Sequence, residues 1–205
     1  MSNDVQITYV NNSVNYDRLT VFVFTKNMTP TFDVMADGIA WRIMPNIGKG
    51  SSSCFIYPIE IGLQAMWGGY NTTQMISAQI GERYTVSEDS TGIVLQPGGS
   101  ASQPTAIEIE SMVQVSGGIR AQICKDGQVL MHKDIVAYGQ RAAFILHPKL
   151  YWGVASEIQE GQPISSAVLN SDHFFEQDLE GVTKATVTLI GNPKEGYRFI
   201  VDNQE

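Results

Sequence analysis

The stretch IRAQICKDGQVLMHKDIV, residues 119–136, predicts a β-hairpin and constrains the fold more than any other segment. Two runs of strand-forming residues flank Asp126-Gly127, and a type I′ turn needs positive φ at both central positions, which Asp tolerates and Gly accepts. With Lys125 and Gln128 beside the turn, the expected cross-strand pairs are Cys124–Val129, Ile123–Leu130 and Ala121–His132. Because side chains alternate between the faces of a strand, Ile119, Ala121, Ile123 and Leu130 are expected to share a core face.

Further strand-like segments follow one another at short spacing and are separated by turn residues. The clearest are 5–10, 19–26, 39–44, 54–57, 59–66, 75–80, 83–87, 93–95, 106–115, 142–147, 150–156, 164–169, 184–190 and 198–201. Such spacing is typical of antiparallel sandwiches and barrels. We expect an all-β chain, an antiparallel β-sandwich with at most one short helix. Residues 170–180 could form that helical turn or another short strand.

The domain organisation has two interpretations. The first is a single β-sandwich domain over residues 1–205, and the alternative is two small β domains, 1–95 and 106–205, joined by the linker-like stretch QPGGSASQPT at 96–105. A weak internal similarity raises the alternative of two pseudo-repeated halves, but its spacings differ, and we favour the interpretation that a polar loop, a buried strand and a terminating proline recur in any β protein. Gly50, Phe55-Ile56 and Pro58 resemble Gly139, Phe144-Ile145 and Pro148, and each group is followed by a Trp-Gly pair, at Trp67 and at Trp152.

Composition and charge narrow the possible partners. The net charge is −8 and charged residues make up only 17% of the chain. An acidic balance repels phosphate backbones, so we expect no nucleic-acid partner. Apolar runs are too short to span a bilayer and no secretory signal is visible, which predicts a cytoplasmic protein without a transmembrane segment. A surface with few charges, on a fold with many strand edges, predicts a homo-oligomer.

Residues that could carry chemistry are present but form no recognisable catalytic arrangement. His132 and Asp134 share a strand face and could act as a base or hold a metal, or could be a hydrogen-bonded structural pair, which we favour. The stretch Asp172–Glu180 could bind a hard cation, although a solvated acidic face suits its spacing better. Cys54 and Cys124 are expected to be reduced. We therefore predict no enzyme activity, no cofactor and no metal.

Aromatic residues beside glycines are the strongest candidates for ligand or partner contacts. Trp67, Tyr70 and Asn71 surround Gly68-Gly69, and Tyr151-Trp152 precede Gly153. Rigid aromatic rings next to turns can stack on sugar rings or anchor a protein partner, because they contribute contact area at low entropic cost. The alternative is that these rings fill the ends of the sandwich.

The segments KDGQVLMHKDIVAYGQRAAFILHP and WGVASEIQEGQ resemble a group of uncharacterised bacterial β-sandwich proteins. The resemblance implies the fold and a bacterial, non-secreted origin, but no activity and no site. The function expected from the sequence is therefore a non-enzymatic β-sandwich protein that acts in self-assembly or protein binding. The alternative is a lectin-like or toxin-like module that binds carbohydrate or membrane through its aromatic loops.

Overall fold

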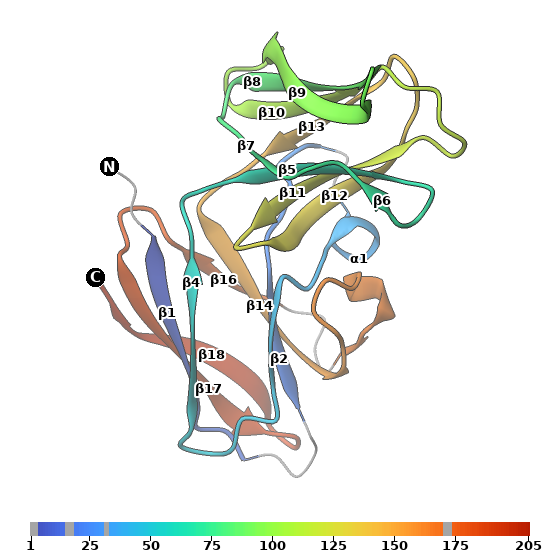
Figure 1. Cartoon of the computed structure of the whole chain (residues 1–205). Coiled ribbons are helices and arrows are strands. Elements are labelled where there is room, and N and C mark those ends of the chain that lie inside the picture. The colour runs from blue at the N-terminus through green and yellow to red at the C-terminus, as the bar shows by residue number, and fades with distance from the viewer. Residues whose placement is uncertain (1–3, 15–18, 31–32, 170–173) are drawn as a thin grey trace. The chain divides into compact units, whose positions relative to one another are not determined.

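The computed structural model describes residues 4–14, 19–30, 33–169 and 174–205, and it is built almost entirely of β-strands (Figure 1). Within this part the helical segments are the single turn α1 (Val34–Asp37) and the 3-10 turn η1 (Ile164–Ser166). The predicted all-β sandwich class is confirmed. The chain divides into two compact units: unit 1 comprises Met1–Thr25, Val34–Ile59 and Pro148–Glu205, and unit 2 comprises Lys26–Asp33 and Glu60–His147.

Unit 1 contains two sheets. The first has the strand order β18-β17-β1-β4, made of Gly196–Gln204, Lys184–Asn192, Val5–Asn11 and Ser52–Tyr57. The second has the order β15-β14-β2-β3, made of Val168–Leu169, Lys149–Glu157, Thr20–Phe24 and Arg42–Pro45, and β16 (Phe175–Asp178) also pairs with β14. All pairs are antiparallel except β1 with β17.

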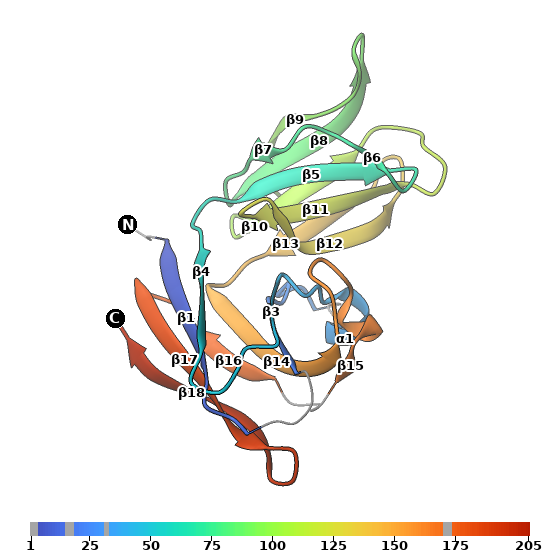
Figure 2. The same cartoon turned by 60° about the horizontal axis from the view of Figure 1, so that its bottom comes forward.

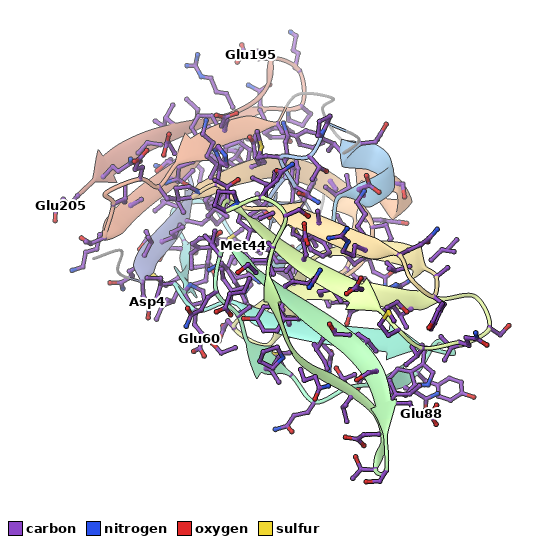
Figure 3. The ribbon with its side chains drawn as sticks, turned by 90° about the horizontal axis from the view of Figure 1, so that it is seen from above. Asp4, Met44, Glu60, Glu88, Glu195 and Glu205 are labelled. Carbon is purple, nitrogen blue, oxygen red and sulfur yellow. The ribbon has the colours of Figure 1, made fainter. Side chains whose placement is uncertain are left out.

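Unit 2 repeats this arrangement with different strands. Its first sheet has the order β13-β10-β8-β9, made of Arg141–Ile145, Ala106–Ser111, Glu82–Asp89 and Gly92–Ser100. Its second has the order β12-β11-β5-β6, made of Gln128–Val136, Ile119–Lys125, Gly62–Trp67 and Asn71–Thr72, and β7 (Ile76–Ser77) also pairs with β5 (Figure 2). Again one pair, β10 with β8, is parallel. Both units therefore have one four-stranded mixed sheet and one five-stranded antiparallel sheet.

The core of unit 1 is organised around Trp152, which is fully buried. Its ring centroid lies 6.3 Å from that of Tyr9, 6.0 Å from Phe55 and 5.8 Å from Phe199, so it joins strands of both sheets. The indole Nε1 donates a hydrogen bond of 2.9 Å to Oε1 of Gln177, which satisfies its buried donor.

A second apolar cluster covers the other face of the β15-β14-β2-β3 sheet. Two segments meet there, residues 34–41 before β3 and residues 158–167 after β14. They are joined by backbone hydrogen bonds from Ala40 N to Gln162 O at 3.0 Å and from Ile164 N to Gly38 O at 2.9 Å. The cluster comprises Ala40 and Ile164 from these segments and Phe22, Phe24, Tyr151 and Ala155 from β2 and β14. We call these two segments the cap of unit 1.

The predicted hairpin is present, with a shifted register in one strand. Asp126 and Gly127 have φ of 50° and 72°, Lys125 pairs with Gln128, and Cys124 pairs with Val129. A bulge follows. Ile123 therefore pairs with Met131 and not with Leu130 as expected, and His132 pairs with Gln122 and not with Ala121. Leu130 is the extra residue, and a bulge of this kind cannot be read from alternation alone.

The stretch interpreted as a linker also differs. Gln96–Ser100 form the second half of β9 and pair with β8, because a bulge at Gly98 accommodates the proline and glycines in an edge strand.

In the described residues, no helix is long and apolar enough to cross a bilayer.

Candidate functional site: the loop end of unit 2

Three connections of unit 2 lie at the same end of its sandwich. The ladders pair Trp67 with Asn71, Met66 with Arg120, and Ile119 with Val136, so β5, β6, β11 and β12 all begin or finish there. The connections are 68–70 between β5 and β6, 112–118 between β10 and β11, and 137–140 between β12 and β13 (Figure 2). We call this region the loop end of unit 2.

The first connection carries three of the residues expected to contact a ligand or partner. Gly68 and Gly69 have φ of 59° and 82°, a conformation that side chains with a Cβ rarely adopt, and they make the tight β5–β6 hairpin. Tyr70 follows them and is 84% exposed, and Asn71 is also exposed. Trp67 is half-buried, since alternation places it on the same face as buried Leu63 and Ala65.

The other two connections add apolar side chains that the sequence did not single out. Met112 is 42% exposed, and its backbone N–H donates to Val86 O at 2.8 Å. Tyr138 is 54% exposed and sits in a turn closed by a hydrogen bond from Gln140 N to Ala137 O at 2.9 Å. Ile135, at the end of β12, is 73% exposed. Local sequence patterns identify each turn separately, but only the order of the strands in the sheets shows that these turns lie at one end of the unit.

A shallow pocket of about 260 Å³ adjoins these residues. It is lined by Thr29, Lys133, Asp134, Ile135, Val136, Gln140, Arg141, Ala142 and Ala143. The Arg141 guanidinium is already engaged, because its Nη1 lies 3.3 Å from Oε2 of Glu108. Burial would raise the pKa of Glu108, but hydrogen bonds from Ser102 and the charge of Arg141 outweigh it, so this pKa is lowered. The pair anchors β10 to β13 beneath the pocket.

His132 and Asp134 are in contact, as their shared strand face predicted. His132 Nε2 lies 3.3 Å from Oδ2 of Asp134, and the Arg120 guanidinium binds the same carboxylate. The His132 side chain is 12% exposed and is not part of the pocket lining, whereas Asp134 is 45% exposed. The Asp134 carboxylate is thus contacted by both His132 and Arg120 across β11 and β12, a contact of the kind expected of the structural pair favoured from the sequence.

Tyr151 and Trp152, also expected to contact a ligand or partner, lie in the core of unit 1 instead. Trp152 is 0% and Tyr151 4% exposed, because β14 is an interior strand with both faces covered. Burial raises the pKa of the Tyr151 hydroxyl. Their burial agrees with the alternative interpretation in so far as the rings fill the sandwich, but they do so from an interior strand and not at its ends.

The structure describes only part of the stretch that was considered for metal binding. Asp172 and His173 lie outside the described residues, while Glu176 and Asp178 are exposed positions of β16, and Glu176 is bound by Lys149. Among the residues that the structure describes, no three His, Cys, Asp or Glu side chains are grouped as metal ligands would be. Cys54 and Cys124 are unbonded, and burial raises the pKa of the Cys124 thiol to about 11.

Comparisons with known proteins found no match: no family model, no curated protein and no solved structure is significantly similar to this chain.

Proposed function

We propose that the protein is a non-enzymatic binding protein that holds a protein partner at the loop end of unit 2. The observation that carries the proposal is the presence at one end of unit 2 of Tyr70, Met112, Ile135 and Tyr138, which come from three separate segments of the chain and are 42–84% exposed. Single exposed apolar residues are ordinary on a protein surface, but a group of this size at one end of a rigid sandwich marks an interaction site.

The residue types favour a protein partner. Tyr and Met are enriched at protein interfaces, and Tyr is among the residues that contribute most binding energy there. Arg120 and Asp134 lie beside this apolar group, at the position a polar rim takes in such interfaces. The strands behind the loops fix them through ladder hydrogen bonds, so little conformational entropy is lost when a partner binds.

A site-specific photo-crosslinker tests this proposal. Benzophenone side chains are placed at Tyr70 and Tyr138, and at Ile80 as the control, in extract of the cells that make the protein. Ile80 is also in unit 2 and is 53% exposed, but it precedes β8, whereas the loop end is where β8 finishes. We expect a common protein adduct at Tyr70 and Tyr138 and none at Ile80. No adduct at either tyrosine, or the same adduct at all three positions, would reject the proposal.

A carbohydrate ligand is the second candidate, and Tyr70 is the observation that favours it. The ring is 84% exposed and follows Gly68-Gly69, which leaves its face open for stacking on a sugar. Binding on a glycan array that is lost in Tyr70→Ser and kept in Tyr138→Ser would replace the protein partner with a glycan. We place the protein in the cytoplasm, a proposal supported by its two unbonded cysteines, one of them exposed.

A further inference from the structure

The two units have the same topology, and each combines strands from both halves of the chain. Four consecutive blocks describe this: the first is β1–β4, the second β5–β9, the third β10–β13 and the fourth β14–β18. Unit 1 pairs the first block with the fourth, and unit 2 pairs the second with the third. The first block matches the third in strand order and direction, so that β1, β2, β3 and β4 correspond to β10, β11, β12 and β13. The second block matches the fourth in the same way, from β5 with β14 to β9 with β18.

The match extends to single residue pairs. Thr8 of β1 lies between Cys54 and Thr186, while its counterpart Glu108 of β10 lies between Ala143 and Arg83. The Phe55-Ile56 pair of β4 and the Phe144-Ile145 pair of β13 then occupy equivalent register positions.

Irregular features also coincide. β9 has a bulge at Gly98, between the residues that pair with Tyr84 and Arg83, and β18 has one at Asp202, between those that pair with Val187 and Thr186. Gly50 N donates to Asn11 O at 2.6 Å, and Gly139 N donates to Ser111 O at 2.7 Å. Bulges and turn hydrogen bonds are features of one particular fold, so their coincidence indicates two copies of one repeat, residues 5–100 and 106–204.

The repeats are interlocked. Each repeat sends its second block into the other unit, through the short connections 58–61 and 146–148. Unit 1 is consequently closed by blocks from opposite ends of the chain. They are joined by the parallel β1–β17 ladder and the antiparallel β2–β14 ladder, which we call the seam of unit 1.

We propose that a second copy of this chain is a binding partner, held by exchange at the seam of unit 1. When unit 1 opens, the first block of one molecule is free to pair with the fourth block of another through the same ladders and the same aromatic contacts around Trp152. A pair can close reciprocally into a dimer, and an open-ended series extends into a filament. The new interface needs no surface that the monomer does not already contain. This proposal is independent of the loop end of unit 2.

Concentration sets the balance between closure and exchange. Closure within one molecule is favoured by the effective concentration of two tethered blocks, on the order of 1 mM for short tethers. Because the seam buries Trp152 between Tyr9 and Phe55, exchange requires unfolding of unit 1 and is slow in the native state. Oligomers formed by refolding at high concentration should therefore persist after dilution.

Refolding and a cysteine pair across the seam test the proposal together. Thr20 and Ala155 are direct partners in the β2–β14 ladder, as are Val21 and Val154. In a Cys54→Ser background, Thr20→Cys protein is mixed with Ala155→Cys protein, refolded from denaturant at about 1 mM, and oxidised. We expect a disulfide-linked species of twice the 22.5 kDa chain mass in the mixture, and none when either variant is refolded alone. The double variant, oxidised as a dilute monomer and then refolded at about 1 mM with its disulfide intact, should remain monomeric, whereas the same variant refolded at that concentration after reduction should form oligomers.

Several results would overturn the proposal. The first is that protein refolded at about 1 mM sediments only as a monomer. The second is that oligomers form without the disulfide-linked species, although the double variant does cross-link within one chain; this result would show that the oligomers form by surface association. Failure of both the Thr20/Ala155 and the Val21/Val154 double variants to cross-link would show that the seam does not pair as described.

Discussion

Asn46 and Ile135 occupy equivalent positions in the two units and share a left-handed backbone, with φ of 59° and 58°. Each lies at the end of an edge strand: Asn46 directly follows β3, which pairs with β2, and Ile135 is the second-last residue of β12, which pairs with β11. The repeat thus requires a left-handed residue here. Asn accommodates this conformation, whereas a β-branched residue is strained in it.

We predict that Ile135→Asn stabilises the protein by about 1 kcal/mol, the usual cost of a left-handed non-glycine residue. The gain is expected because Ile135 is 73% exposed and loses little burial when it is replaced. Chemical denaturation measures it. The reciprocal change Asn46→Ile is the control and should destabilise by a similar amount. Destabilisation by Ile135→Asn would mean that the isoleucine side chain contributes more to folding than the backbone strain costs.

A second prediction concerns the turn of the β11–β12 hairpin. Gly127 has φ of 72° and no heavy atom within 4 Å of a Cβ built on it, so a substitution there meets backbone strain but no clash. Gly127→Val should cost about 1–3 kcal/mol, and Gly127→Asn considerably less. Thermal unfolding of the two variants separates the explanations: equal losses would indicate a steric cause.

The Glu108–Arg141 pair makes a prediction about pH. The pKa of Glu108 is lowered in the folded protein, so its ionised form stabilises the native state at neutral pH. That stabilisation is present above the unfolded pKa, about 4.3, and is lost as the pH falls through the lower folded value. Glu108→Gln should therefore be less stable than the wild type at pH 7, and the difference should shrink below pH of about 4. A difference that stays constant with pH would show that the charge is not responsible.

Trp152 provides a test of the core of unit 1. Trp152→Phe removes the donor to Gln177 Oε1 and leaves a cavity, so we expect a loss of about 2–4 kcal/mol. Trp67→Phe, at a half-buried site in unit 2, is the matched control and should cost less. Urea unfolding followed by far-UV circular dichroism measures both. Equal losses would contradict the different burial of the two rings.

The sequence predicted the hairpin turn at Asp126-Gly127 because turn chemistry is local. It did not predict the displacement of Leu130, since a bulge depends on how the strand packs within its sheet. The internal similarity was half correct. Phe55-Ile56 and Phe144-Ile145 are equivalent, but Trp152 corresponds to Leu63 in the ladder, so the two Trp-Gly pairs match by coincidence.

The candidate site was predicted in the same partial way. Trp67, Tyr70 and Asn71 were identified because glycines beside aromatics mark a turn. Tyr151-Trp152 has the same local pattern and lies in the core, because β14 is an interior strand. Interior and edge strands are distinguished by long-range pairing, which local pattern does not record. Met112, Ile135 and Tyr138 were missed for the same reason.

The cap of unit 1 has a consequence for how a duplicated chain chooses its pairing. Two similar repeats offer more than one way to combine blocks, and a first block paired with the second would also complete a sandwich. In that arrangement Phe22 and Phe24 would keep only the β2–β3 half of their cover, because the β14–β16 half belongs to the fourth block. The same site in unit 2 carries Gln122 and Cys124, with only the Asp126-Gly127 turn between its strands. The cap is therefore complete only when the first block pairs with the fourth, and this favours that pairing over the alternative during folding.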